Sequence, residues 1–121
     1  REFLDLRSRE RVEVFISVQN LAEMYPNLTG PKNQPPDSPE LARAKIRSIA
    51  SLPGITVLPV TMETAMHALA LCEAYGRTRQ DYFDMQLVAL MQEEGIGTII
   101  TENAGDFAMV EGITVVNPFL S

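Results

Sequence analysis

The chain has 121 residues, of which 45% are hydrophobic, and a formal net charge of −6. This size and composition predict one domain over residues 1–121 with a single core, and argue against disorder. The only cysteine, Cys72, excludes an internal disulfide framework, and no apolar run reaches membrane-spanning length, so we expect a cytoplasmic protein without membrane contact.

The charges are unevenly distributed along the chain. All ten Lys and Arg lie at or before Arg79, whereas residues 80–121 hold seven acids and no basic residue, for a net charge of −7. Acids that converge without a basic neighbour must stay solvated, take up protons or bind a cation. Solvation is the expected answer for Glu93, Glu94 and Glu111.

The first predicted strand covers residues 12–16, which have high β-propensity. Ser17 is a good N-cap for a helix that runs to about Tyr25, where Pro26 is expected to stop it. Before this strand, residues 1–11 form a short amphipathic segment that begins with Arg and has no N-cap. We therefore expect further residues upstream.

Residues 27–37 are rich in Pro, Gly and Asn and predict a surface loop. A helix then begins with Ser38 as N-cap and Pro39 at its first position, and Pro53-Gly54 ends it. Apolar residues repeat along it at helical spacing, and the expected buried stripe consists of Ala42, Ile46, Ile49 and Ala50.

The second half begins with a predicted strand at residues 55–60 and a helix that Thr61 caps and Gly76 ends. After a short connection at 77–80, a longer helix is expected over residues 81–94. Asp81 is its expected capping residue. The side chains of these two helices that we expect to be buried are Ala65, Leu69, Cys72, Phe83, Leu87, Val88, Leu90 and Met91.

Two β-branched runs, Thr98–Thr101 and Ile113–Val116, are separated by a short polar crossover and predict buried strands of a parallel sheet. The alternation of helices and strands along the chain predicts an α/β fold, a three-layer α/β/α sandwich with a central parallel sheet. Ligands of such sheets bind beyond the carboxyl ends of the strands, where Asn103 and Asp106 are expected.

Three acids are candidates for a cation site. Asp84 lies one turn before Leu87 and Val88, but a carboxylate in the first turn of a helix is also favourable without any function, and sequence position leaves both interpretations open. Asp106 alone is more simply a turn residue, and Glu23 alone a solvated one. Each of the three acids belongs to a segment that can reach the same edge of the predicted sheet. A cluster of carboxylate oxygens there suits Mg²⁺ or Mn²⁺.

Other chemistry finds less support. The one histidine, His67, lies in mid-helix and fits a surface or packing role, and no zinc ligand set exists. No phosphate-binding glycine motif follows a strand, and no hydroxyl residue has a nearby base for a hydrolase triad. A phosphoacceptor domain of the receiver type also clusters acids at strand ends, but it needs a later Lys, and none follows Lys45.

Three blocks of the sequence resemble the PIN-domain family, and within it the VapC-type toxin ribonucleases: Ile16–Glu23 (ISVQNLAE), Asp81–Ala89 (DYFDMQLVA) and Thr101–Phe107 (TENAGDF) followed by Val116-Asn117-Pro118. The resemblance implies a Mg²⁺- or Mn²⁺-dependent endoribonuclease that hydrolyses RNA phosphodiester bonds as the toxin of a type II toxin–antitoxin pair. The implied partners are RNA, a cognate antitoxin and a second copy of the chain.

By motif position, the resemblance implies that Glu23, Asp84 and Asp106 are catalytic acids and metal ligands, and that Asn103 is a further catalytic residue. The metal would orient and acidify a water for in-line attack on the phosphate. The residues expected to contact the substrate are Thr101, Arg77 and Arg79.

The chain departs from the family in one respect. PIN domains begin with a strand that ends in Asp and supplies the central strand of the sheet, whereas the first predicted strand here matches the family's second. We therefore expect an N-terminal truncation, a gap in mid-sheet, and no active, stable monomer unless the missing strand is supplied. The alternative is a catalytically inactive PIN-like domain that binds protein or RNA.

Overall fold

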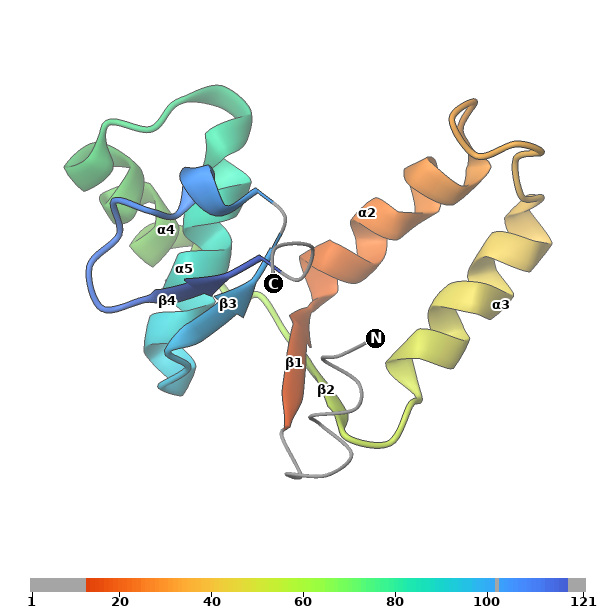
Figure 1. The fold of residues 1–121 in the computed structure, drawn as a ribbon, viewed down its shortest axis with the longest axis horizontal. Helices are drawn as coiled ribbons and strands as arrows, with labels where there is room; N and C mark the ends of the chain where they lie inside the picture. Colours follow the sequence, from red (N-terminus) through yellow and green to blue (C-terminus); the bar gives the residue numbers. More distant parts are fainter. Residues whose placement is uncertain (1–12, 102, 118–121) are drawn as a thin grey trace. The chain divides into compact units, whose positions relative to one another are not determined.

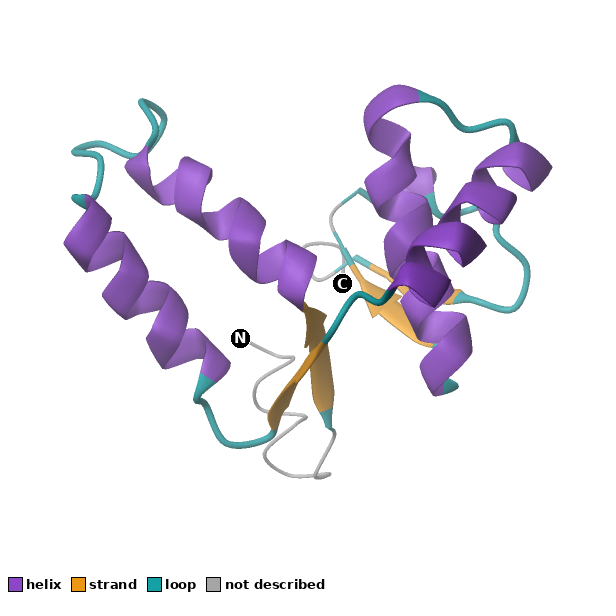
Figure 2. Cartoon of the chain, turned by 180° about the vertical axis from the view of Figure 1, so that it is seen from behind, coloured by secondary structure: helices purple, strands orange, loops and turns teal. Residues whose placement is uncertain are grey.

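The computed structural model describes residues 13–101 and 103–117. They divide into two compact units, which we call unit 1 (residues 13–59) and unit 2 (residues 60–117). Helices make up most of this described chain, and the strands are short (Figure 2). The α/β class is confirmed.

Unit 1 has a β-α-α-β arrangement. The strand β1 (Val14–Ser17) leads into α2 (Val18–Thr29), and α3 (Pro39–Ala50) leads into β2 (Ile55–Leu58). The two strands pair in parallel over their whole length. Figure 1 shows α2 and α3 side by side, and residues of the two helices are in contact.

The helix α2 begins as predicted but ends later. The Ser17 hydroxyl accepts the Asn20 N–H at 3.0 Å, and the Asn20 side chain accepts the Ser17 N–H at 3.2 Å, which completes a capping box. The prediction that Pro26 stops the helix is wrong, because α2 continues to Thr29. Proline has a helical φ, and the Thr29 hydroxyl adds a bond to the Tyr25 carbonyl at 2.9 Å across the last turn.

Unit 2 holds the remaining elements, which in chain order are α4 (Met62–Tyr75), η1 (Arg79–Asp81), α5 (Tyr82–Glu94), β3 (Thr98–Ile100), η2 (Ala104–Asp106) and β4 (Thr114–Val116). The helices α4 and α5 pack together, and β3 pairs with β4 in parallel as predicted.

Thr61 caps α4 by accepting the Thr64 N–H at 3.1 Å, and Gly76 ends it with φ 65°. Asp81 occupies the N-cap position of α5 as predicted, but its side chain makes no cap bond to the helix.

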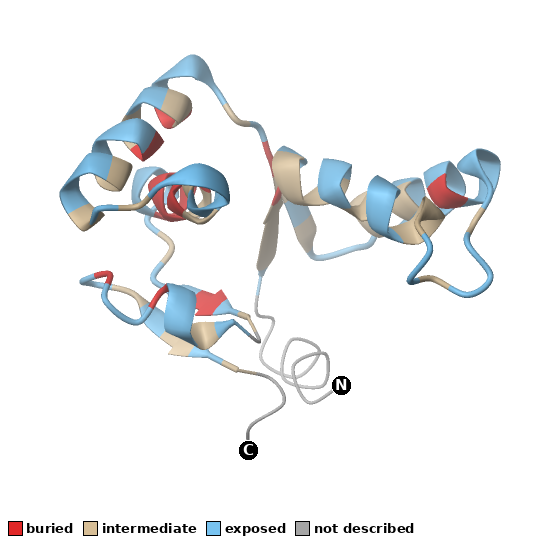
Figure 3. Ribbon diagram, turned by 90° about the horizontal axis from the view of Figure 1, so that it is seen from above, coloured by how far each residue is buried: buried red, intermediate tan, exposed pale blue. Residues whose placement is uncertain are grey.

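The hydrophobic core lies in unit 2, and Figure 3 shows buried positions concentrated on α5. The buried residues that form this core come from α4, α5, β3 and the segment before β4: Ala68, Met85, Val88, Ala89, Met91, Ile99, Phe107 and Val110. In the described part of unit 1, by contrast, the only buried residues are Ser17, Ala42 and Leu58.

Some predicted core positions are not buried. Of the expected stripe on α3, only Ala42 is buried. On α4 the buried face lies at Thr64 and Ala68, one residue before the predicted one, and Leu69 is exposed. The helix α4 carries apolar side chains on most of its circumference, so apolar spacing does not identify its buried face.

The described strands form two separate parallel pairs, β1 with β2 and β3 with β4. The sequence predicted a central sheet with a gap, and within residues 13–101 and 103–117 no strand joins the two pairs. Whether the two units make up one domain stays a prediction. No helix of the described chain is long and apolar enough to cross a membrane.

Candidate active site

The segment after β3 turns sharply, and backbone bonds fix its path. The Thr101 N–H donates to the Val116 carbonyl at 2.9 Å, which extends the pairing of β3 with β4. The Thr101 hydroxyl then accepts the Asn103 N–H at 3.1 Å, and the Asn103 carbonyl accepts the Asp106 N–H at 3.0 Å. Asn103 and Asp106 therefore lie just beyond the carboxyl end of a parallel strand, as predicted.

Asp106 presents its carboxylate to solvent. The next residue, Phe107, is buried in the core of unit 2, whereas Asp106 is exposed. Its carboxylate makes no hydrogen bond or ion pair with any other residue of the described chain. No side-chain bond of the kind that a turn or cap aspartate can make is present for Asp106 within the described chain.

Asp84 lies in the first turn of α5 and is half-buried. The two residues after it, Met85 and Gln86, are both buried, and the Gln86 amide donates to the Tyr82 hydroxyl at 3.3 Å. This packing fixes the backbone that carries Asp84. A carboxylate in the first turn of a helix also interacts favourably with the helix dipole.

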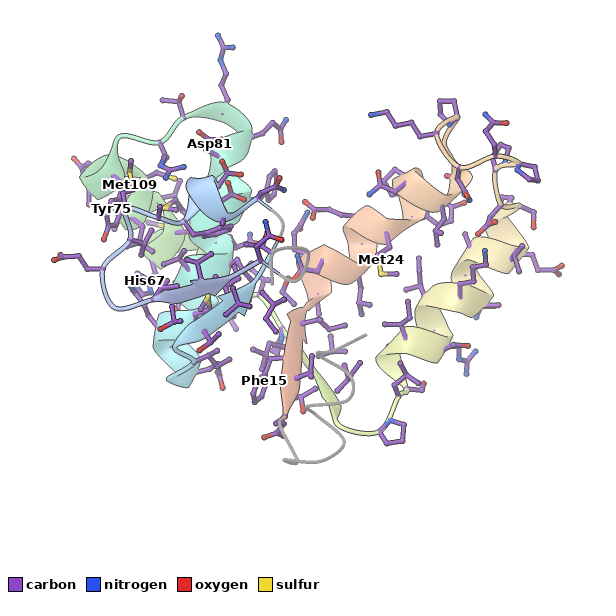
Figure 4. All side chains as sticks on the ribbon, in the orientation of Figure 1. Phe15, Met24, His67, Tyr75, Asp81 and Met109 are labelled. Atoms are coloured by element: carbon purple, nitrogen blue, oxygen red, sulfur yellow. The ribbon has the colours of Figure 1, made fainter. Side chains whose placement is uncertain are left out.

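Arg77 connects the segments that carry the two aspartates. Its Nη2 donates to the backbone carbonyl of Asp106 at 2.8 Å, and its Nη1 lies 4.0 Å from Oδ2 of Asp81, directly before α5. One guanidinium therefore bridges η2 and the start of α5, at the end of unit 2 where Figure 4 labels Asp81. Asp84 and Asp106 belong to the two segments that this bridge holds together.

Arg79 differs from Arg77, although only one residue separates them. It is exposed, and its backbone has φ 55°, a conformation that residues other than glycine adopt infrequently. Its side chain makes no hydrogen bond or ion pair with another described residue. Arg79 is therefore available to an anion in solution, whereas Arg77 is already engaged.

Glu23 lies in unit 1, on the exposed side of α2, where its Oε2 accepts from the Gln19 amide at 3.4 Å. Among residues 13–101 and 103–117, no three His, Cys, Asp or Glu side chains are grouped as a metal site. Carboxylate and amide oxygens from Asp84, Asp106 and Asn103 fit Mg²⁺ or Mn²⁺ in kind, and a complete ligand set needs further oxygen atoms.

Sequence reasoning missed one polar cluster between α4 and α5. The Thr64 hydroxyl donates to Glu93 Oε1 at 2.8 Å, and Glu93 Oε2 lies 3.1 Å from His67 Nδ1. Glu93 is exposed, as expected for a solvated acid, but it also binds these two side chains of α4. His67, labelled in Figure 4, lies on α4 and is partly exposed. A Thr and a Glu that are 29 residues apart give no local signal of this contact.

Comparison with known proteins identifies a family. The family model of the PIN domain matches residues 1–112, which include Glu23, Asp84 and Asp106. A comparison with curated proteins gave no match.

Proposed function

The chain belongs to the PIN-domain family, and from this premise we propose that it is a Mg²⁺- or Mn²⁺-dependent endoribonuclease. PIN domains are nuclease-type folds. The observation that carries the proposal is the arrangement in unit 2, where one arginine holds the Asp106 segment at the start of the helix that bears Asp84. The exposed Asp106 carboxylate, which makes no bond to the described chain, supports a ligand-binding role.

Each residue of the site has a distinct role in this proposal. The carboxylates of Asp84 and Asp106 would hold a divalent cation, with the Asn103 amide as a neutral oxygen donor. The family resemblance implies that Glu23 is a third acid. When bound, the cation would supply Lewis-acid activation of the scissile phosphate and of the attacking water. The Thr101 hydroxyl, which accepts the Asn103 N–H, orients the segment on which these oxygen atoms lie.

RNA binding requires positive charge, which residues 80–121 do not contain. Arg79 is exposed and contacts the RNA backbone in this proposal. The other contacts come from basic residues before it or from a partner. A toxin role, a cognate antitoxin and a homodimer are part of the same proposal, and the family resemblance is what supports them.

A second candidate function is a catalytically inactive PIN domain that binds RNA or protein. One observation favours it: the described chain holds no group of three potential metal ligands. The two functions differ in one measurable property, because only the nuclease converts RNA into shorter products in a metal-dependent way.

The test is an RNA cleavage assay with the intact protein in Mg²⁺ or Mn²⁺, repeated after removal of the metal with EDTA. Asp84→Asn keeps the size of the side chain but removes its charge, and we expect it to lower kcat at least about a thousandfold, the loss of several kcal/mol of transition-state stabilisation. Glu94→Gln, an exposed acid on the same helix, is the matched control and should retain activity. Cleavage that survives Asp84→Asn or EDTA would contradict the proposal.

A further inference from the structure

The Arg77 side chain is largely covered, although the residues that follow it, 78–81, are exposed. Its side chain is only 11% exposed, against 55% for the nearby Asp81. It follows Gly76, whose left-handed conformation ends α4, and its own N–H donates to the Cys72 carbonyl at 2.9 Å. The backbone at this helix end is thus fixed, and little of the side chain that extends from it is exposed.

Arg77 donates its hydrogen bond to the backbone carbonyl of Asp106, and not to the Asp106 carboxylate. The guanidinium Nη2 donates to the Asp106 carbonyl at 2.8 Å, and a charged donor makes a stronger bond than a neutral one. The Asp106 side chain remains exposed. Arg77 therefore fixes the position of Asp106 without neutralising the carboxylate by direct pairing.

The end of α4 holds the same segment at a second point. The Tyr75 hydroxyl accepts the Glu111 N–H at 3.4 Å. Between these two tethers, Phe107 and Val110 are buried in the core. Residues 104–111 are thus held by apolar burial on one side and by two side chains of α4 and its C-terminal extension on the other.

We infer that Arg77 is a positioning residue, which holds the Asp106 carboxylate at the start of α5 so that it shares a divalent cation with Asp84. This inference rests on the proposed function and revises the expectation that Arg77 contacts substrate phosphates. Engagement of Nη2 with Asp106 and of Nη1 with Asp81 leaves that contact to Arg79.

The test compares Arg77→Gln with Arg79→Gln, the same substitution two residues away, in the intact protein. The probe is Mn²⁺, and its dissociation constant is measured by titration without RNA. Loss of a residue that orients a metal ligand typically weakens metal binding about 10–100-fold, and we expect this for Arg77→Gln. Arg79→Gln should leave the Mn²⁺ dissociation constant unchanged and raise KM for RNA. Equal Mn²⁺ affinity of Arg77→Gln and wild type would overturn the inference.

Hydrogen–deuterium exchange gives a second readout that does not depend on metal or activity. Arg77→Gln should speed exchange of the amides of residues 104–111 about tenfold, the effect of losing one charged hydrogen bond, with α5 unchanged. Faster exchange throughout unit 2 would show a general structural role and overturn the inference. If Arg77→Gln does not fold, Arg77→Lys is tested in its place. Lysine keeps the charge but cannot contact both Asp106 and Asp81. Exchange of residues 104–111 should then rise by less than about tenfold.

These measurements separate failure of the inference from failure of the proposed function. A wild-type protein that neither binds Mn²⁺ nor cleaves RNA would contradict the proposed nuclease, whereas the exchange pattern would still show whether Arg77 holds the Asp106 segment. An active, Mn²⁺-binding wild type whose Arg77→Gln variant has normal affinity and exchange would refute the role of Arg77 alone.

Discussion

Units 1 and 2 differ in how their helices are held. In unit 2, α5 is buried along most of its length and its core extends to β3 and the segment before β4. In unit 1, α2 buries no residue completely, and α3 buries only Ala42. The acids Asp84 and Asp106 thus lie on a part of the chain with its own core. Glu23 lies on a helix whose stability depends more on its caps and on its strand.

The largest effect is expected from the core of unit 2. Phe107→Ala removes a buried ring directly beside Asp106, and such truncations typically cost about 3–5 kcal/mol in the free energy of unfolding. Thermal or urea unfolding measures the loss. An effect below about 1 kcal/mol would show that the core is less tightly packed than described and would weaken the contrast between the units.

The polar cluster of α4 and α5 should contribute less than the core. Thr64→Val keeps the shape of a side chain that is 1% exposed but removes its bond to Glu93. A hydrogen bond to a charged group is worth about 1.5–3 kcal/mol, and we expect a loss in this range. Thr78→Val, at an exposed position without a side-chain cap bond, is the control and should change stability by less than about 0.5 kcal/mol. Equal changes in the free energy of unfolding for Thr64→Val and Thr78→Val would contradict a stabilising role of the bond between Thr64 and Glu93.

The cap of α2 tests the stability of unit 1. Ser17→Ala removes the hydroxyl that accepts the Asn20 N–H, and loss of such a cap typically costs about 1 kcal/mol. Because α2 has little buried area of its own, hydrogen exchange should rise mainly in this helix. Ser48→Ala, an exposed position in α3, should leave the exchange of both helices unchanged. Faster exchange of α5 after Ser17→Ala would contradict the local effect.

The smallest effect is expected on the exposed apolar surface of unit 1. Leu41 is 47% exposed on α3, so Leu41→Ala should change the free energy of unfolding by less than about 0.5 kcal/mol. The measurement is urea unfolding of the intact protein. A loss above about 1.5 kcal/mol would mean that Leu41 is covered in the intact protein, and the contrast between the two units would then be smaller than these residues indicate.

Local signals in the sequence predicted most of the element boundaries. Ser17, Ser38 and Thr61 all act as N-caps, and Gly76 ends its helix, because each of these roles depends on residues within one turn. The failure at Pro26 shows the limit of a local rule, since proline near a helix end does not always terminate it.

Contacts between distant residues were not predictable in the same way. The sequence placed Asn103 and Asp106 beyond the end of a strand from the pattern alone. It did not identify Arg77 as the partner of Asp106, nor Glu93 as the partner of Thr64, because each pair is 29 residues apart. From charge and position, the sequence suggested a phosphate contact for Arg77 and solvation for Glu93. The structure shows Arg77 bonded to the Asp106 carbonyl and Glu93 bonded to Thr64.

The most direct test of the central claim is to locate Mn²⁺ by anomalous diffraction from crystals of the intact protein. The account predicts a Mn²⁺ ion bonded to carboxylate oxygens of both Asp84 and Asp106, at roughly 2.0–2.3 Å as for hard cations of this size. Arg77 should still donate to the Asp106 carbonyl. Saturating Mn²⁺ that binds elsewhere, with both carboxylates unligated, would contradict the assignment of these two residues as the metal site.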